Sequence, residues 1–185
     1  MGTQSFQESG QYDGVNHHFV YDAENRIVSV DSGIGYIYDA EGRRVGKTNG
    51  TVYTVGTSGQ VLDEVDGTAW KRSEVYVGSR HLATVTSTGV TFTHSDWLGT
   101  ERARTNAAGM LCESTSSSPF GDNVQQSGTC NVSPQFFTGK PRDTESNLDD
   151  SAHATSVRSG VAGCRQTGPL HQALFRMQRL PIHNR

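Results

Sequence analysis

The chain has 185 residues, of which 33% are hydrophobic, 8% aromatic and 19% charged, and it contains 21 glycines. This length suits one domain, and so lean an apolar content favours many short strands joined by glycine turns. The net charge of −3 gives no argument for nucleic-acid binding by the whole chain. The charge is uneven, because residues 1–150 hold 11 Lys and Arg against 19 Asp and Glu, whereas residues 151–185 hold five Arg and no acid.

The sequence predicts neither a membrane-spanning helix nor a signal peptide. No apolar run approaches the ~18–20 residues that a membrane-spanning helix needs. The N-terminus, MGTQSFQESGQYDG, has neither a basic start nor an apolar stretch, so it does not look like a signal peptide.

A repeat marks the first quarter of the chain. Residues 19–30 read FVYDAENRIVSV and residues 36–47 read YIYDAEGRRVGK, so the same Tyr-Asp-Ala-Glu motif recurs 17 residues later. Asp, Glu and Asn or Gly between apolar flanks are typical of a hairpin loop, and each unit is predicted to form strand, tight turn, strand. The structural residues of the repeat are Tyr21, Asp22, Arg26, Tyr38, Asp39 and Arg43.

The same pattern continues in looser form. Residues 51–65 (TVYTVGTSGQVLDEV) and 73–94 (SEVYVGSRHLATVTSTGVTFTH) place turn residues at about the 8–12-residue spacing of an all-β chain. We therefore predict an all-β fold with successive β-hairpins over residues 12–94. A flexible N-terminal segment is expected over residues 1–11 and a loop-rich region over residues 95–150.

Several motifs resemble the RHS, or YD-repeat, family, and in particular its RHS-associated core. They are YDAENRIVSV, YIYDAEGRRV, HSDWLGTERARTNAAG, SPFGD and FTGKPRDTESNLDD, which stand in family order within residues 12–150. Two positions depart from the family: Trp97 replaces the His of a DHLGT box, and Pro141 replaces the Glu of GKERD. The core-motif positions are His94, Asp96, Leu98, Gly99, Pro119, Phe120, Gly121 and Asp122.

The resemblance implies that the hairpins form part of a spiralling sheet that closes as a hollow shell, which encloses a toxic polypeptide or mediates cell contact. A hairpin with one aromatic face needs stacked neighbours to bury that face, so repetition and stability go together. Asp22 and Asp39 are expected to accept backbone N–H groups within their own turns. Some family members cleave themselves with aspartates, but Asp143, Asp149 and Asp150 do not reproduce that motif, so we expect no enzyme activity.

The family pattern stops at Asp150, after which the family continues close to FGARYY…GRF…SPD. If one T were lost from a TTC codon after a GAT codon for Asp150, the restored frame would allow FGARYFRSQRGRWMSPDWSAPPSPVPYAK. We interpret residues 151–185 as frameshifted sequence and the chain as a C-terminal fragment of an RHS protein. The alternative is a genuine tail, disordered or weakly helical, in which Leu170, Leu174 and Met177 line one face of a short basic helix.

The remaining candidate sites are few. Cys112 and Cys130 flank the SPFGD segment, and they are either two free thiols or a disulfide worth about 3 kcal/mol in the chain-entropy model. Cys164 makes the cysteine count odd, so complete pairing within the chain is excluded. No cofactor, metal site or small-molecule substrate is expected. Trp70 and Trp97 are expected to pack against the sheet, and carbohydrate recognition is a family-level alternative.

The leading functional prediction is a non-catalytic structural fragment of a secreted or cell-surface RHS shell. Its expected partners are an upstream YD-repeat shell or a neighbouring chain, joined by β-pairing, and a toxin is the candidate cargo. The alternative is a remnant shell carrying residues 151–185 as a basic effector or nucleic-acid-binding tail. Nucleic-acid binding is the weaker prediction, because 35 residues that contain no Asp or Glu and cannot form a hydrophobic core are too few for a folded effector.

Overall fold

The computed structural model describes residues 6–11 (backbone only), 16–31, 33–118, 121, 123–130, 135–146 and 148–150. Predictions for Pro119, Phe120, Asp122 and Cys164 lie outside these ranges, as do those for the tail 151–185.

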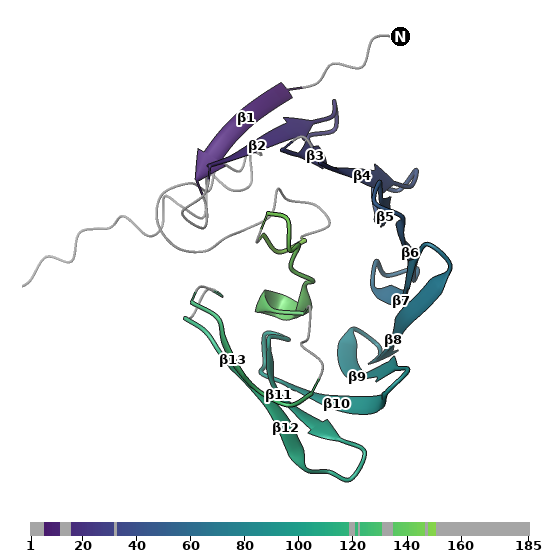
Figure 1. The fold of residues 1–185 in the computed structure, drawn as a ribbon, viewed down its shortest axis with the longest axis vertical. Coiled ribbons are helices and arrows are strands. Elements are labelled where there is room, and N and C mark those ends of the chain that lie inside the picture. Colours follow the sequence, from purple (N-terminus) through teal and green to yellow (C-terminus); the bar gives the residue numbers. More distant parts are fainter. Residues whose placement is uncertain are drawn as a thin grey trace, which may run out of the picture.

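Thirteen strands in the described ranges form one antiparallel sheet in which each strand pairs with the one before it (Figure 1). They are β1 (Phe6–Gln11), β2 (Asn16–Tyr21), β3 (Ile27–Val30), β4 (Ile34–Tyr38), β5 (Arg44–Lys47), β6 (Thr51–Val55), β7 (Val61–Asp66), β8 (Ala69–Val77), β9 (Arg80–Thr86), β10 (Gly89–Ser95), β11 (Glu101–Asn106), β12 (Leu111–Ser116) and β13 (Gln125–Gly128). One short 3₁₀ turn, η1 (Phe137–Gly139), follows them.

The predicted all-β fold of successive hairpins is confirmed, and the sheet extends beyond the region where hairpins were expected. Strand β1 lies within the segment 1–11 that was expected to be flexible, and it pairs with β2 over six residues. Strands β11, β12 and β13 lie within the region 95–150 that was expected to be loop-rich. Polar, Ser- and Thr-rich strands hide the apolar alternation on which strand prediction from sequence depends.

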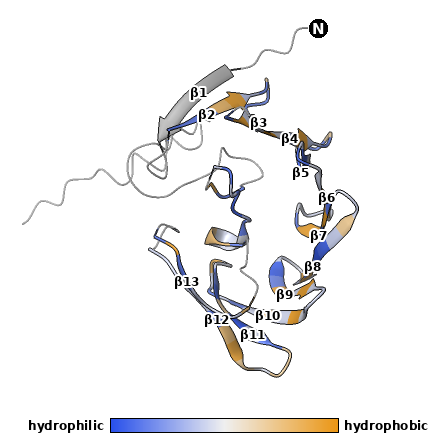
Figure 2. Cartoon of the chain, viewed as in Figure 1, coloured by the Kyte–Doolittle hydropathy of each residue, from blue (hydrophilic) through white to orange (hydrophobic). Residues whose placement is uncertain are grey.

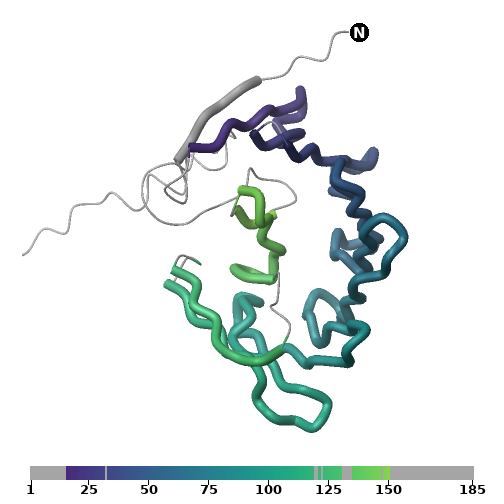
Figure 3. Tube along the Cα trace, viewed as in Figure 1, coloured from purple at the N-terminus to yellow at the C-terminus, as the bar shows by residue number. Residues whose placement is uncertain are grey.

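The sheet curves into an open arc, and the chain after β13 turns back into the hollow of that arc (Figures 1 and 3). We call strands β1–β13 the wall and residues 135–146 with 148–150 the inner segment. The inner segment holds η1 and two isolated β-bridges, Gln135 to Pro141 and Arg142 to Asp149. It therefore has backbone structure of its own while it lies against the concave face of the wall.

The hydrophobic core is small and lies where the first hairpins meet the inner segment. Its buried members are Phe19, Tyr21, Ile27, Val30, Tyr36 and Leu148. Leu148 comes from the inner segment and is 3% exposed, so this segment completes a core that the wall alone leaves open. Elsewhere apolar residues are dispersed along the arc and do not form one layer (Figure 2).

Several apolar side chains of the wall are exposed while acidic ones are buried. Ile37, Val52 and Phe92 are 48%, 54% and 45% exposed, whereas Glu64 and Glu74 are 8% and 6% exposed. Strand register explains the first of these: Tyr36 and Ile37 alternate along β4, and Ile37 lies opposite Gly46 of β5 on the outer face. The concave face therefore carries buried polar groups on β7 and β8 beside the hydrophobic core of β2–β4.

Candidate functional site

A five-residue turn connects the strands of each YD hairpin and holds its aspartate. Asp22 Oδ1 accepts the backbone N–H groups of Glu24 (3.0 Å) and Arg26 (2.9 Å), and Asp22 Oδ2 accepts Arg26 Nε at 2.6 Å. The main chain closes the same turn, because Asp22 N donates to Arg26 O at 3.0 Å. The carboxylate thus replaces water for two N–H groups that the hairpin leaves unpaired.

The second YD unit repeats this geometry. Asp39 Oδ1 accepts the N–H groups of Glu41 (3.0 Å) and Arg43 (2.8 Å), and Asp39 Oδ2 accepts Arg43 Nε at 2.7 Å. Desolvation alone would raise the pKa of both aspartates, but the hydrogen bonds from Arg26 and Arg43 outweigh it and hold each pKa below its usual value. Each carboxylate therefore accepts three hydrogen bonds from residues of its own turn.

Four further turns in the described ranges share the backbone pattern, and sequence reasoning missed them as copies. In residues 56–60, 96–100, 106–110 and 136–140 the first N–H donates to the fifth carbonyl, and the fourth residue is a glycine with φ between 70° and 85°. Asp96 and Asn106 supply the side-chain acceptor in two of them, whereas the other two begin with Gly56 and Phe136. An Asp or Asn followed three residues later by Gly is the signal that would have found the turns at 96–100 and 106–110.

Of the core-motif residues that the structure describes, Asp96, Leu98 and Gly99 belong to the turn 96–100. Asp96 Oδ1 accepts the N–H groups of Leu98 and Thr100, and Asp96 Oδ2 accepts Arg102 Nε at 3.0 Å. Gly99 has φ 85°, as its position in the turn requires, and Gly121 has φ 87°. His94 Nε2 lies 3.0 Å from Thr105 Oγ1 on an exposed part of β10.

The expectation that both tryptophans pack against the sheet is wrong for Trp97. Trp97 is 90% exposed at the second position of the turn 96–100, at the edge of the cavity described below. Trp70 on β8 is 43% exposed, and its Nε1 donates to Ser73 Oγ at 3.1 Å.

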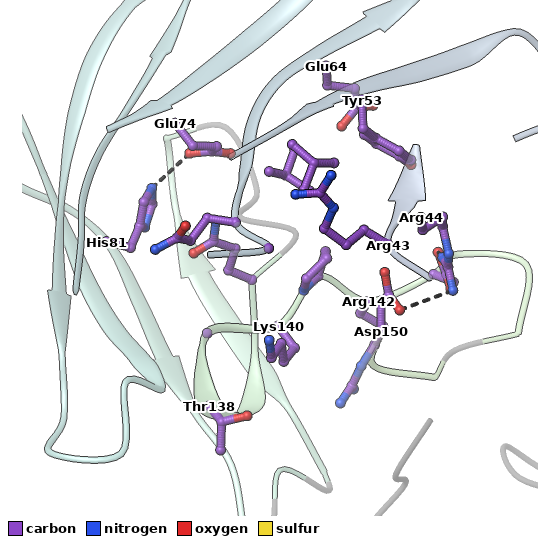
Figure 4. Close-up of a pocket in the computed structure, with 18 of the residues that line it drawn as sticks. Arg43, Arg44, Tyr53, Glu64, Glu74, His81, Thr138, Lys140, Arg142 and Asp150 are labelled. Carbon is purple, nitrogen blue, oxygen red and sulfur yellow. Dashed lines mark hydrogen bonds and ion pairs between the residues drawn. The ribbon is translucent and has the colours of Figure 1, made fainter. Parts of the chain in front are cut away.

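A cavity of about 1420 Å³ lies between the concave face and the inner segment (Figure 4). Tyrosines from the wall and polar groups from the inner segment line it, among them Tyr53, Tyr76, Thr138, Lys140 and Arg142. Burial raises the pKa of Tyr53 and of Tyr76 to about 12, so both hydroxyls stay protonated at neutral pH. The lining offers hydrogen-bond donors, acceptors and charges of both signs.

A buried polar network forms the β8–β9 part of the lining. Glu74 Oε2 lies 2.8 Å from His81 Nε2 and accepts Thr84 Oγ1 at 2.6 Å, while Arg72 pairs with both Glu64 and Glu74. Desolvation alone would raise the pKa of Glu74, but the bonds from His81 and Thr84 outweigh it and lower that pKa. His81 and Glu74 point toward one another from neighbouring strands in Figure 4.

An ionic cluster, which we call the clasp, joins the inner segment to β5. It consists of Arg44 and Lys47 from the wall and of Asp143, Glu145 and Asp150 from the inner segment. Arg44 Nη1 lies 2.6 Å from Asp143 Oδ2, Arg44 Nη2 lies 3.3 Å from Asp150 Oδ1, and Lys47 Nζ lies 2.7 Å from Asp143 Oδ1. Lys47 Nζ also lies 2.8 Å from Glu145 Oε1.

Tyr36 forms the floor of the clasp. Its hydroxyl donates to Glu145 Oε1 at 2.7 Å, and the Arg44 guanidinium lies 3.9 Å above its ring centroid. The side chains of Arg44, Lys47 and Asp143 are at most 10% exposed. Residues about 100 positions apart are thereby fixed to one another inside the arc.

Other contacts hold the inner segment further along the wall. Gln135 Nε2 donates to the Tyr76 hydroxyl at 3.0 Å, and Thr138 N donates to Thr100 Oγ1 at 3.1 Å. Within the segment, Arg142 pairs with Asp149 at 2.7 Å. The segment therefore contacts β4, β5, β8 and the turn before β11.

A disulfide fastens the end of β13 to β12. Cys112 and Cys130 are bonded with their Cα atoms 5.3 Å apart. Gly128 passes so close to β12 that an added Cβ would lie 2.1 Å from the Cys112 carbonyl oxygen, so only glycine fits there. This covalent link stands just before the chain leaves the wall for the inner segment.

The described ranges contain no group of three or more His, Cys, Asp or Glu side chains placed to hold a metal ion. No helix among them is long and apolar enough to cross a membrane.

Comparison with known proteins finds similarity at the level of the fold. No known family model matches the chain, and no curated protein matches it. The fold is similar to that of the Photorhabdus luminescens Tc holotoxin pore with a TccC3 point mutation (TM-score 0.57, 13% identity, 75% of this chain and 8% of that chain). It is also similar to TcdB2–TccC3 (TM-score 0.54, 14% identity, 75% and 8%). A third match is TcdB2–TccC3 without its hypervariable C-terminal region (TM-score 0.53, 13% identity, 80% and 8%).

These three neighbours support the RHS-like fold expected from the motifs. This chain spans about 8% of the length of each of them. At such low identity the similarity concerns the path of the backbone.

Proposed function

We propose that the chain is a non-catalytic section of an RHS-type shell, in which β1–β13 are wall and the inner segment braces the wall from inside. Its role is to enclose or present a toxic polypeptide or to mediate cell contact. The likeness to Tc toxin chains supports this role, since those structures contain the same curved run of hairpins. As part of such a shell the chain belongs outside the cell that makes it.

The observation that carries the proposal is the burial of charged groups on the concave face. Glu64 and Glu74 line the cavity and are 8% and 6% exposed, whereas the apolar Val52 and Phe92 are 54% and 45% exposed. An isolated globular domain gains its stability by burying apolar surface, and this sheet buries little of it. A hollow lined by charged groups and tyrosines offers hydrogen-bond partners to an enclosed polypeptide.

The ends of the described sheet are the proposed points of assembly. Within the described ranges β1 and β13 each pair with a strand on one side. Edge strands carry unpaired N–H and C=O groups that accept another strand. We propose that neighbouring YD-repeat hairpins, from an upstream shell or a second chain, pair there.

The finer assignment is that residues 12–94 are YD-repeat hairpins, that residues 95–150 are the RHS-associated core, and that the reading frame shifts after Asp150. Sequencing the locus tests it directly. An extra T in an independent isolate, with the restored terminator translated, would support the assignment. An invariant frame with residues 151–185 detected as peptides in the expressed protein would refute it.

The shell proposal is tested by hydrogen–deuterium exchange on the full chain, alone and mixed with a separately expressed YD-repeat segment. We expect amides of β1 or β13 to exchange fast in the isolated chain and to slow when the repeats are added, while β6–β9 stay protected throughout. As a control, the chain is mixed with a β-sheet protein that contains no YD repeats. A monomer whose edge strands exchange as slowly as β6, with no response to the repeats, would overturn the proposal.

A further inference from the structure

The clasp is buried, and its negatively charged groups outnumber its positively charged groups. Three carboxylates, those of Asp143, Glu145 and Asp150, share the two cations Arg44 and Lys47. Asp150 is the outlying member, because its ion pair with Arg44 is the longest of the cluster at 3.3 Å. Like charges brought together out of water make one of them costly to keep ionised.

We propose that the inner segment is a strap over the concave face and that protonation of the clasp sets how firmly the strap is held. Mild acid tightens it, because taking up one proton balances the three carboxylates against the two cations that form ion pairs with them. This inference goes beyond the shell role: it makes access to the cavity of about 1420 Å³ dependent on pH.

The strap geometry follows from how the segment is attached. Its first residue, Gln135, is held by the Tyr76 hydroxyl of β8, and its apolar contribution to the core is one buried side chain, Leu148. Most of its remaining hold comes from charged and polar contacts. Breaking the clasp would therefore free the segment over β4 and β5 while β6–β13 keep their ladder of strand pairs.

Other charged and titratable groups face the clasp and complete its electrostatics. From the wall these are Tyr36 and Tyr38 of β4, Tyr53 of β6 and Glu64 of β7, and from the inner segment Lys140. Burial raises the pKa of Tyr36, Tyr38 and Tyr53, so none of these tyrosines supplies a charge near neutral pH. The carboxylates with a shifted pKa are Glu145 and Asp150, and Lys140 opposes the rise at Asp150 without cancelling it.

The sign of the pH effect follows from two opposite shifts. Burial, reinforced by Asp143, raises the pKa of Asp150 in the docked state, so docking takes up a proton and the gain is lost as pH rises through that raised pKa. Desolvation would also raise the pKa of Glu145, but bonds from Lys47 and Tyr36 lower it, so its contribution is lost as pH falls below about 4. The strap is firmest between these limits.

Hydrogen–deuterium exchange of peptides covering residues 140–150 in the full chain tests the proposal at pH 5.0 and pH 7.5. Each rate is divided by the intrinsic exchange rate of that amide at that pH, and peptides from β6–β9 report global unfolding. One linked proton changes an equilibrium by up to about tenfold per pH unit. We expect the wild-type strap to be roughly threefold or more better protected at pH 5.0, with β6–β9 unchanged.

Two variants and a control make the test specific. Asp150→Asn removes the excess charge, so strap protection at pH 7.5 should rise to the pH 5.0 value and the pH dependence should vanish. Lys47→Gln enlarges the excess, so protection at pH 7.5 should fall. Asp66→Asn changes a carboxylate that is 46% exposed and outside the clasp, and should behave as wild type.

The proposal is overturned if the wild-type strap has equal protection at both pH values, or if Asp150→Asn keeps the wild-type pH response. It is also overturned if strap and β6–β9 change in parallel, because the effect would then be global. None of these results bears on the edge-strand experiment, so failure of the strap proposal and failure of the shell proposal can be told apart.

Discussion

Removing the carboxylate of Asp22 tests whether the YD aspartate is a structural acceptor of its turn. Asp22 is 8% exposed and accepts three hydrogen bonds, two of them from backbone N–H groups of Glu24 and Arg26. Asp22→Ala leaves those two donors without their acceptor in a tight turn. Asp22→Asn keeps an oxygen in the Oδ1 position and removes the charge.

The magnitudes separate the two variants. A backbone hydrogen bond of this kind contributes about 1 kcal/mol net, so Asp22→Ala should cost about 2–3 kcal/mol of the free energy of unfolding. The ion pair with Arg26, whose side chain is 31% exposed, is screened by solvent and contributes about 0.5–1 kcal/mol, which is the expected cost of Asp22→Asn. Asn106 already performs this role in its own turn, accepting Ala108 N and Met110 N at 3.0 and 3.1 Å.

Urea unfolding of the full chain, followed by circular dichroism, measures both costs. The pKa of Asp22 is lowered in the folded state, so its contribution is present above the usual range of Asp and is lost as pH falls through the folded pKa. The difference between wild type and Asp22→Asn should therefore shrink below about pH 4. The reasoning fails if Asn destabilises as much as Ala, or if Ala costs less than about 0.5 kcal/mol.

Three further outcomes are expected in the same unfolding assay. Cys112→Ser, or reduction of the Cys112–Cys130 bond, should cost about 3 kcal/mol, and denatured thiol counts that do not change on reduction would exclude the bond. Gly128→Ala should lower the free energy of unfolding by more than about 2 kcal/mol, because the added Cβ would collide with the Cys112 carbonyl oxygen. Gly33→Ala is the control, because Gly33 has open space around it, and it should change the free energy of unfolding by no more than about 0.5 kcal/mol. Equal effects of the two substitutions would contradict the close approach at Gly128. Leu148→Ala should cost about 2–4 kcal/mol and expose the strap to protease before the wall, and a neutral effect would place Leu148 outside the core.

The sequence by itself determined the local structure. A carboxylate that accepts N–H groups two and four residues away, and a residue with positive φ at the fourth position, are properties of a pentapeptide, so DAENR and DAEGR predict their turns wherever they stand. The 17-residue repeat and the regular spacing of turns likewise predicted successive antiparallel hairpins. Trp97 was misplaced because its position in such a turn was not recognised.

Only the tertiary structure decided what lies on the concave face. Arg44 and Asp143 are 99 residues apart, and Tyr36 and Glu145 are 109 apart, so no local pattern links them. Their meeting depends on the curvature of β1–β13, which accumulates from the twist of every strand pair and brings a distant segment back into the hollow. From the sequence, a charged residue in a Ser-rich chain is expected to be exposed to solvent. The curvature of the sheet buries the charged residues of the clasp, so the clasp and the cavity could be found only in the structure.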